Sequence, residues 1–189
     1  MDMFDKKVVM SVFIAAIMIL STIGFVANYQ TSESLKYNGH KFYKTQKGLM
    51  TRMDGKALYF NYFPKSLEDI NVTEGISSIL NNKESVSFTY NPNATHADAI
   101  AEMYFYLEQA FTGMKNAYVL QGLTNSTGYT LPEINCKDAT EFVPVLIFEQ
   151  SNETRITTEN NCVKAYFATR TDVSRLGDRI VYSITGIMQ

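Results

Sequence analysis

The hydrophobic pattern divides the chain into one uninterrupted apolar run and a longer part in which apolar and polar positions alternate. Residues 8–27 (VVMSVFIAAIMILSTIGFVA) form the run and carry no charge. A helix of that length spans about 30 Å, which matches the hydrocarbon core of a bilayer. We therefore expect a transmembrane anchor over 8–28, between a short tail (1–7) and a polar connector (29–35).

A cleaved secretory signal is the main alternative to an uncleaved anchor. Such a signal needs small residues at positions −3 and −1 of its cleavage site, and a cut after Ala27 would place Phe25 at −3. The run is also longer than the apolar core of most signals. A buried helix of a soluble domain would carry polar residues along one face, which this run lacks. The uncleaved anchor is the favoured interpretation.

The charges that flank the run predict its orientation. Lys6 and Lys7 precede it, and the first charge that follows is Glu33. Because positive residues stay on the cytoplasmic side, the tail is expected inside the cell. Residues 36–189 are then expected outside the membrane as one domain.

The first part of this domain has the pattern of a β-meander. Residues 36–63 predict three strands, with turns at Asn38-Gly39 and at Asp54-Gly55. The second dipeptide is the stronger hairpin signal, because a type I′ turn needs positive φ at both central positions. The last strand is expected over 56–63 and is ended by Pro64. Short helical pieces, capped by Ser66 and Thr73, are expected over 65–82.

A β-α-β unit is expected next. Alternating apolar residues predict a strand over 86–90, and a second strand is predicted over 117–123. Between them, Thr95 and Asp98 have the spacing of a capping box, and Gly113 stands where the helix is expected to end. A crossover of this kind favours a parallel pair of strands.

The last third predicts more strands and a final helix. A loop is expected over 124–141, and strands are expected over 143–150, 155–158 and 162–169. Pro144 should place the first of these strands at a sheet edge, since proline cannot donate to the ladder.

The final helix is expected to be amphipathic, with Thr171 as its cap and Gly186 at its end. Asp178 and Arg179 are expected on its polar side, as a local ion pair or cap. The fold class is therefore α+β: an N-terminal transmembrane helix, a β-meander, a β-α-β unit, further strands and a C-terminal amphipathic helix.

Composition and charge exclude several functions. The net charge of −2 and the pI of about 5.7 exclude non-specific nucleic-acid binding, which needs a basic face. Two cysteines and two histidines give only the bare minimum of four ligands for one zinc module, and the histidines stand 56 positions apart, outside the short spacing that such modules use. We expect no metal and no cofactor.

Catalytic motifs are not found. His40 and His96 stand far apart and belong to no metal-binding or nucleophile-activating motif. The carboxylate pairs Glu68-Asp69 and Asp138/Glu141 are interpreted as solvated surface charge, not as the acid pair of a glycosidase. No catalytic residue is expected.

Two features of residues 36–189 favour export. Four Asn-x-Thr sequons are predicted glycosylation sites, at Asn71, Asn93, Asn125 and Asn152. Both cysteines, Cys136 and Cys162, also lie in this part, and in an oxidising compartment they would form a disulfide. Two buried thiols are the alternative.

Several segments together resemble a group of small membrane-anchored archaeal proteins from reduced-genome lineages. The segments are 37–42 (YNGHKF), 54–56 (DGK), 62–64 (YFP), 136–140 (CKDAT), 143–145 (VPV), 151–154 (SNET), 159–163 (ENNCV) and 178–184 (DRIVYSI). The resemblance covers nearly the whole chain and implies an anchored, surface-facing protein. It also supports pairing of the two cysteines. No activity is known for the group, so it implies no catalytic residue.

Three functions are compared. The favoured one is a non-enzymatic cell-envelope protein, held in the bilayer by 8–28, with an interaction or structural role and an envelope protein or a second copy as partner. The alternative is an accessory subunit of a membrane complex, since small residues in the run permit close approach of helices. An extracellular hydrolase would need a perturbed acid or base in a cleft, and the sequence offers none.

Overall fold

The computed structural model describes residues 6–29 and 34–189, with side chains described in the first helix for residues 10–21. The chain forms two compact units, Met1–Ser34 and Leu35–Gln189. Most of the predicted tail 1–7 lies outside the described residues, as do residues 30–33 of the predicted connector.

The first unit contains helix α1 (Lys6–Tyr29), where the apolar run predicts a helix. Its described large apolar side chains are 48–69% exposed, from Met10 to Leu20. Among the residues that the structure describes, no helix is both long enough and apolar enough to cross a membrane. The membrane anchor therefore stays a prediction.

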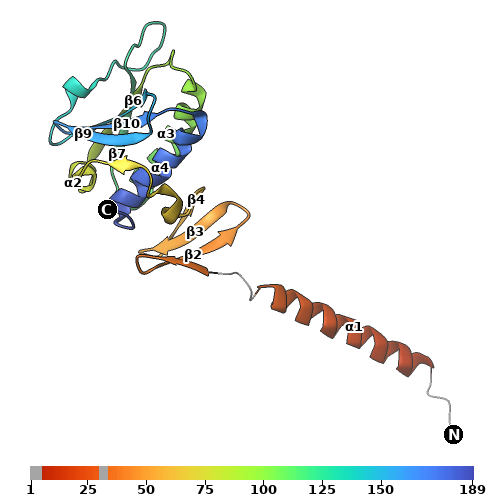
Figure 1. The fold of residues 1–189 in the computed structure, drawn as a ribbon. Helices are drawn as coiled ribbons and strands as arrows, with labels where there is room; N and C mark the ends of the chain where they lie inside the picture. The colour runs from red at the N-terminus through yellow and green to blue at the C-terminus, as the bar shows by residue number, and fades with distance from the viewer. Residues whose placement is uncertain (1–5, 30–33) are drawn as a thin grey trace. The chain divides into compact units, whose positions relative to one another are not determined.

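The second unit begins with the predicted meander, drawn in orange in Figure 1. It has four strands and not three. These are β1 (Ser34–Tyr37), β2 (His40–Thr45), β3 (Gly48–Met53) and β4 (Lys56–Phe60), paired in chain order. Both predicted hairpin turns are confirmed, because Asn38-Gly39 and Asp54-Gly55 have positive φ at both positions. The last strand ends at Phe60, before Pro64, because the backbone N–H groups of Asn61 and Tyr62 donate to the carboxylate of Asp178.

A mixed six-stranded sheet follows, with the order β5-β9-β10-β8-β6-β7. Its strands are β5 (Asn71–Val72), β6 (Ser85–Tyr90), β7 (Tyr118–Leu123), β8 (Val145–Gln150), β9 (Arg155–Glu159) and β10 (Cys162–Phe167). The β-α-β prediction is confirmed, because β6 and β7 are parallel neighbours. The expectation for Pro144 is wrong: β8 lies inside the sheet, between β10 and β6. Pro144 precedes the strand and so removes no donor from the ladder.

The helix ends differ from the predicted caps. Helix α3 (Ala97–Ala110) begins after His96, which has φ 66°, and no side chain caps it, so the Thr95 capping box is wrong. A π-helical turn, η2 (Phe111–Lys115), follows α3 without a break. The left-handed residue that ends this segment is therefore Asn116, with φ 52°, and not Gly113.

The caps of the other helices also differ from the predicted ones. Helix α4 (Arg170–Thr185) is capped by Thr169, two residues before the predicted Thr171, and Gly186 ends it as expected. The region 65–82 contains the short helices η1 (Pro64–Leu67) and α2 (Ile76–Leu80), and neither Ser66 nor Thr73 caps them.

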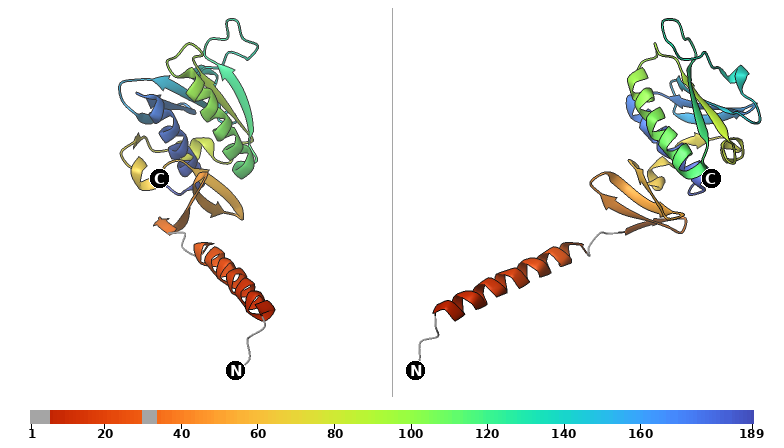
Figure 2. Two further views of the ribbon diagram at one scale, coloured as in Figure 1. Left: turned by 90° about the vertical axis from the view of Figure 1, so that its right-hand side faces the viewer. Right: turned by 180° about the vertical axis from the view of Figure 1, so that it is seen from behind.

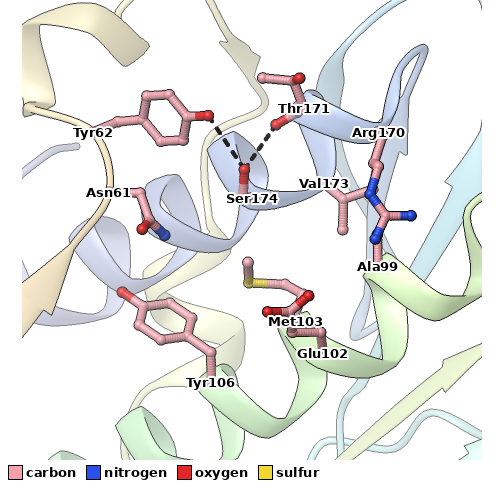
Figure 3. Close-up of a pocket in the computed structure, with 10 residues that line it drawn as sticks. All are labelled: Asn61, Tyr62, Ala99, Glu102, Met103, Tyr106, Arg170, Thr171, Val173 and Ser174. Carbon is pink, nitrogen blue, oxygen red and sulfur yellow. Dashed lines mark hydrogen bonds between the residues drawn. The ribbon is translucent and has the colours of Figure 1, made fainter. Parts of the chain in front are cut away.

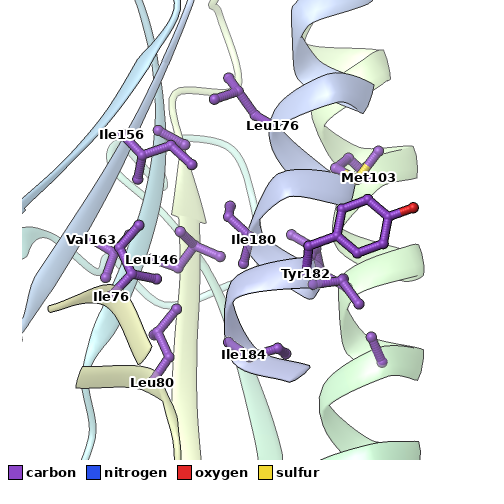
Figure 4. Packing of buried hydrophobic residues seen from close by; sticks show 14 of the residues in the cluster. Ile76, Leu80, Met103, Leu146, Ile156, Val163, Leu176, Ile180, Tyr182 and Ile184 are labelled. Atoms are coloured by element: carbon purple, nitrogen blue, oxygen red, sulfur yellow. The ribbon is translucent and has the colours of Figure 1, made fainter. Parts of the chain in front are cut away.

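The two faces of the six-stranded sheet are covered differently. Helices α3 and α4 lie side by side on one face (Figure 2), and with α2 they enclose the main core. Figure 4 shows α4 contributing Leu176, Ile180 and Ile184 to this core. The other face carries a smaller cluster, in which Ile134, Cys136 and Ala139 pack on Val145, Ile147 and Cys162. The loop after β7 thus serves as the cover of the second face.

Candidate functional site

The candidate site is a groove of about 500 Å³ between α3, α4 and the segment that follows β4 (Figure 3). Helix α4 presents its first turns to the groove, and α3 presents side chains from Ala99 to Tyr106. The groove is lined by Asn61, Tyr62, Ala99, Glu102, Met103, Tyr106, Arg170, Thr171, Val173 and Ser174. Three separate stretches of the chain therefore meet at this surface.

Hydroxyl groups form the centre of the groove's polar lining. The hydroxyls of Tyr62 and Ser174 lie 3.3 Å apart, and Ser174 donates to the carbonyl of Thr171 at 3.0 Å (Figure 3). At the rim, Arg170 donates to Asp98 at 2.6 Å, which lowers the pKa of that carboxyl. Both side chains of this pair are largely exposed, so the pair adds little to stability.

Asp178 is bonded to two of the residues that line the groove. Its side chain is fully buried, and its Oδ2 accepts the backbone N–H groups of Asn61 at 2.7 Å and Tyr62 at 2.8 Å. Burial raises the pKa of Asp178 to about 7, against the opposing effect of those N–H groups and of the Tyr106 hydroxyl. Asp178 is thus a buried acid that holds one wall of the groove in place.

The prediction that Asp178 and Arg179 lie on an exposed polar face is wrong. Both are buried, and each has its own partners: Arg179 donates to Ser183 Oγ at 2.5 Å and to the carbonyl of Gln189 at 2.7 Å. Burial lowers the pKa of Arg179. The sequence held one signal for this burial, because residues 180–184 (IVYSI) are apolar on nearly all sides, as expected of a helix end enclosed by the core.

The groove presents hydroxyl, amide and carboxylate groups beside an aromatic wall, which suits the binding of a polar ligand or a peptide segment. His40 and His96 lie at the starts of β2 and α3, and neither lines the groove. Within the described ranges, no cluster of three potential ligands could hold a metal ion.

Three carboxylates of the two sequence pairs, Glu68, Asp69 and Asp138, have hydrogen-bond or ion-pair partners. Glu68 accepts the hydroxyl of Tyr37 at 3.1 Å, and Asp69 binds Arg175 at 2.6 Å. Asp138 accepts the backbone N–H of Asn135 at 2.8 Å, as part of a capping box. These contacts fix loops and helix ends.

The disulfide is confirmed. Cys136, in the short helix η3 (Cys136–Asp138), is bonded to Cys162, the fully buried first residue of β10. The alternative of two buried thiols is therefore wrong. The same loop is also held by the Thr89 hydroxyl, which donates to the carbonyl of Ile134 at 2.7 Å.

The four sequon asparagines all have exposed side chains. Asn71 lies in β5, and the others lie in the segments that follow β6, β7 and β8: Asn93, Asn125 and Asn152.

A second hollow, of about 510 Å³, lies where β6 and β8 end. In the strand order, the chain passes from β6 to β7 toward one edge strand, and from β8 to β9 and β10 toward the opposite edge strand. This is the topological switch point, where α/β sheets commonly bind ligands. The hollow is lined mostly by polar side chains, including Asn91, Asn93 and Glu149. Sequence reasoning missed it because it depends on strand order.

Comparisons with protein families, with curated proteins and with solved structures find no match for this chain.

Proposed function

We propose that this chain is a membrane-anchored protein of the cell envelope whose disulfide-bonded α+β domain lies outside the membrane and has an interaction or structural role. The observation that carries the proposal is the bond between Cys136 and Cys162. These are the chain's only cysteines, and disulfides form and persist mainly in oxidising, extracytoplasmic compartments.

The anchor rests on the sequence of residues 8–27. Twenty uncharged residues match the thickness of a bilayer, and exposed apolar side chains such as Phe13 and Leu20 would find their cover in lipid. Lys6 and Lys7 favour a cytoplasmic N-terminus. The resemblance to membrane-anchored archaeal proteins points the same way.

The interaction role is supported by the groove between α3 and α4. Its hydroxyls and its aromatic wall provide hydrogen bonds and contact area, and a buried carboxylate fixes part of its lining. Tyrosine side chains give large contact areas at low conformational cost, which favours binding.

A fractionation experiment tests the proposal. The full-length chain should stay in the membrane pellet after alkaline carbonate extraction, whereas the double variant Ile17→Lys/Leu20→Lys should leave it, because charges at the centre of the span oppose insertion. Ser21→Ala is the matched control and should behave as the wild type. In denaturant, where both sulfur atoms are accessible, a thiol-reactive label should modify Cys136 and Cys162 only after reduction. A soluble wild-type chain with reactive thiols would overturn the proposal.

An accessory subunit of a membrane complex is the second candidate. It is favoured by large exposed apolar residues on the domain, among them Phe142 at 79% and Tyr118 at 67%. Crosslinking after extraction in mild detergent tests this candidate: a subunit gives a discrete larger product that Phe142→Ser and Tyr118→Ser weaken, whereas the monomer mass alone contradicts it.

A further inference from the structure

Three of the four sequons lie at the same edge of the six-stranded sheet. Strand β6 is parallel to both β7 and β8, so the carboxyl ends of these three strands meet at one edge. Asn93 follows β6, Asn125 follows β7 and Asn152 follows β8.

The register of the other strands places the fourth sequon, at Asn71, at the same edge. Asn71 of β5 is paired with Arg155 of β9. Arg155 is also paired with Tyr166 of β10. Tyr166 is paired on its other side with Glu149, near the end of β8. Asn71 therefore lies level with the carboxyl end of β8. We call this edge, with Asn71, Asn93, Asn125 and Asn152, the carboxyl pole.

The opposite edge of the sheet has asparagines but no sequon. Asn82 precedes β6, Asn116 precedes β7 and Asn160 precedes β10, and none of them has Ser or Thr two positions later. The chain also enters the domain at this edge. The Asn38 side chain, in the turn after β1, donates to the carbonyl of Ile187, just beyond the end of α4.

The four sequons have the exposure that modification requires. All four asparagine side chains are exposed, and across the described part of the chain no hydrogen bond engages any of their Nδ2 atoms. Each has threonine at the second following position. Accessibility and motif thus coincide at every acceptor on this pole.

We propose that the carboxyl pole carries N-linked oligosaccharides on Asn71, Asn93, Asn125 and Asn152, so that modification is confined to this end of the sheet. The proposal rests on the proposed export of the domain. In the reaction, Nδ2 bonds to the anomeric carbon of a lipid phosphate-linked oligosaccharide, and the bond from that carbon to the phosphate oxygen breaks. The lipid phosphate leaves with the electron pair, and the amide loses one proton to solvent.

One consequence concerns the hollow at the switch point. Asn93 lines it, and Thr124, next to Asn125, lines it as well. Oligosaccharides on Asn93 and Asn125 would therefore lie at the mouth of this hollow.

The test is synthesis of the full-length chain in the presence of microsomes, with endoglycosidase digestion and added protease. We expect four glycan steps, with one step lost in each of Asn71→Gln, Asn93→Gln, Asn125→Gln and Asn152→Gln. Glu84→Thr is the matched control: it creates a sequon at exposed Asn82 on the opposite edge, and a fifth step there shows that the assay reports both poles.

The outcomes separate this proposal from the proposed function. A chain that is protected from protease but gains fewer than four glycans overturns the glycosylated pole and leaves export intact. A chain that protease degrades and that gains no glycan overturns both.

Discussion

The ring of Tyr182 stacks on the ring of Phe60, with centroids 4.1 Å apart and planes inclined by 18°. Tyr182 belongs to α4 and Phe60 to the last strand of the meander. The Tyr182 hydroxyl also donates to the carbonyl of Tyr62 at 2.8 Å. Because both rings are fully buried, this contact joins the meander to the helical layer in one core.

Removing this contact should uncouple the meander from α4. We expect Tyr182→Ala to lower the free energy of unfolding by about 3–5 kcal/mol, the usual cost of deleting a buried aromatic ring. Tyr182→Phe keeps the ring but leaves the Tyr62 carbonyl without this donor, and should cost about 1–2 kcal/mol. Urea denaturation measures both. Tyr118→Phe, at an exposed ring, is the control and should stay within about 0.5 kcal/mol of the wild type.

Asp178 should make the stability fall as the pH rises from about 4 to about 7. Its pKa is raised from 3.8 to about 7 in the folded protein, so the folded state holds one more proton than the unfolded state in this window. The contribution is fully present below pH 4, is lost by about pH 7, and corresponds to about 4 kcal/mol at 1.36 kcal/mol per pKa unit.

Asp178→Asn tests this dependence, because an amide oxygen accepts the same backbone N–H groups but does not ionise. Urea titrations at several pH values should show the variant losing the decline between pH 4 and 7 and exceeding the wild type at pH 8. Asp54→Asn, in an exposed turn, should keep the wild-type profile. Equal pH profiles for Asp178→Asn and the wild type would contradict the assignment.

The disulfide should stabilise the domain by about 3 kcal/mol, as expected for a bond between residues separated by 26 positions. Cys136→Ser/Cys162→Ser should lower the unfolding free energy by that amount and free the loop that covers the second face of the sheet. Hydrogen exchange should then be faster at the Ile134 amide, which is bonded to the carbonyl of Leu123, than in α3. Adding reductant should destabilise the wild type and leave the variant unchanged.

Gly48 should tolerate substitution less well than Gly39. Gly48 has φ +109°, and a Cβ there would lie 2.5 Å from the carbonyl oxygen of Phe60. Gly39 has φ +81°, with no atom within 4 Å of such a Cβ. We expect Gly48→Ala to lower the free energy of unfolding by about 3 kcal/mol and Gly39→Ala by about 1 kcal/mol, because at Gly39 only the backbone conformation is strained. Equal losses in thermal unfolding would argue against the close approach at β4.

Local chemistry predicted the elements whose cause is local. Asn38-Gly39 and Asp54-Gly55 require positive φ in succession, and both turns are where those dipeptides stand. The alternation in β6 and the apolar spacing in α3 likewise depend on nearby residues. The sequence placed the end of this helix at Gly113, so the π-helical turn was not predicted. The helical segment in fact ends at Asn116, which takes the left-handed conformation.

The sequence could not predict what long-range packing decides. β8 is an inner strand because β10 and β6 pair with its two sides, although Pro144 pointed to an edge. Asp178 is buried where the segment that follows the meander, more than 100 positions earlier, supplies its two N–H donors. The groove between α3 and α4 depends on the same contact, so pattern alone offered no view of it.

Protease treatment of intact cells that make the full-length chain with a tag at each terminus tests the proposed membrane topology most directly. We predict that the C-terminal tag is lost while the N-terminal tag survives in the membrane fraction, and that both are lost once the cells are permeabilised. Survival of both tags in intact cells, with the chain in the soluble fraction, would contradict this topology.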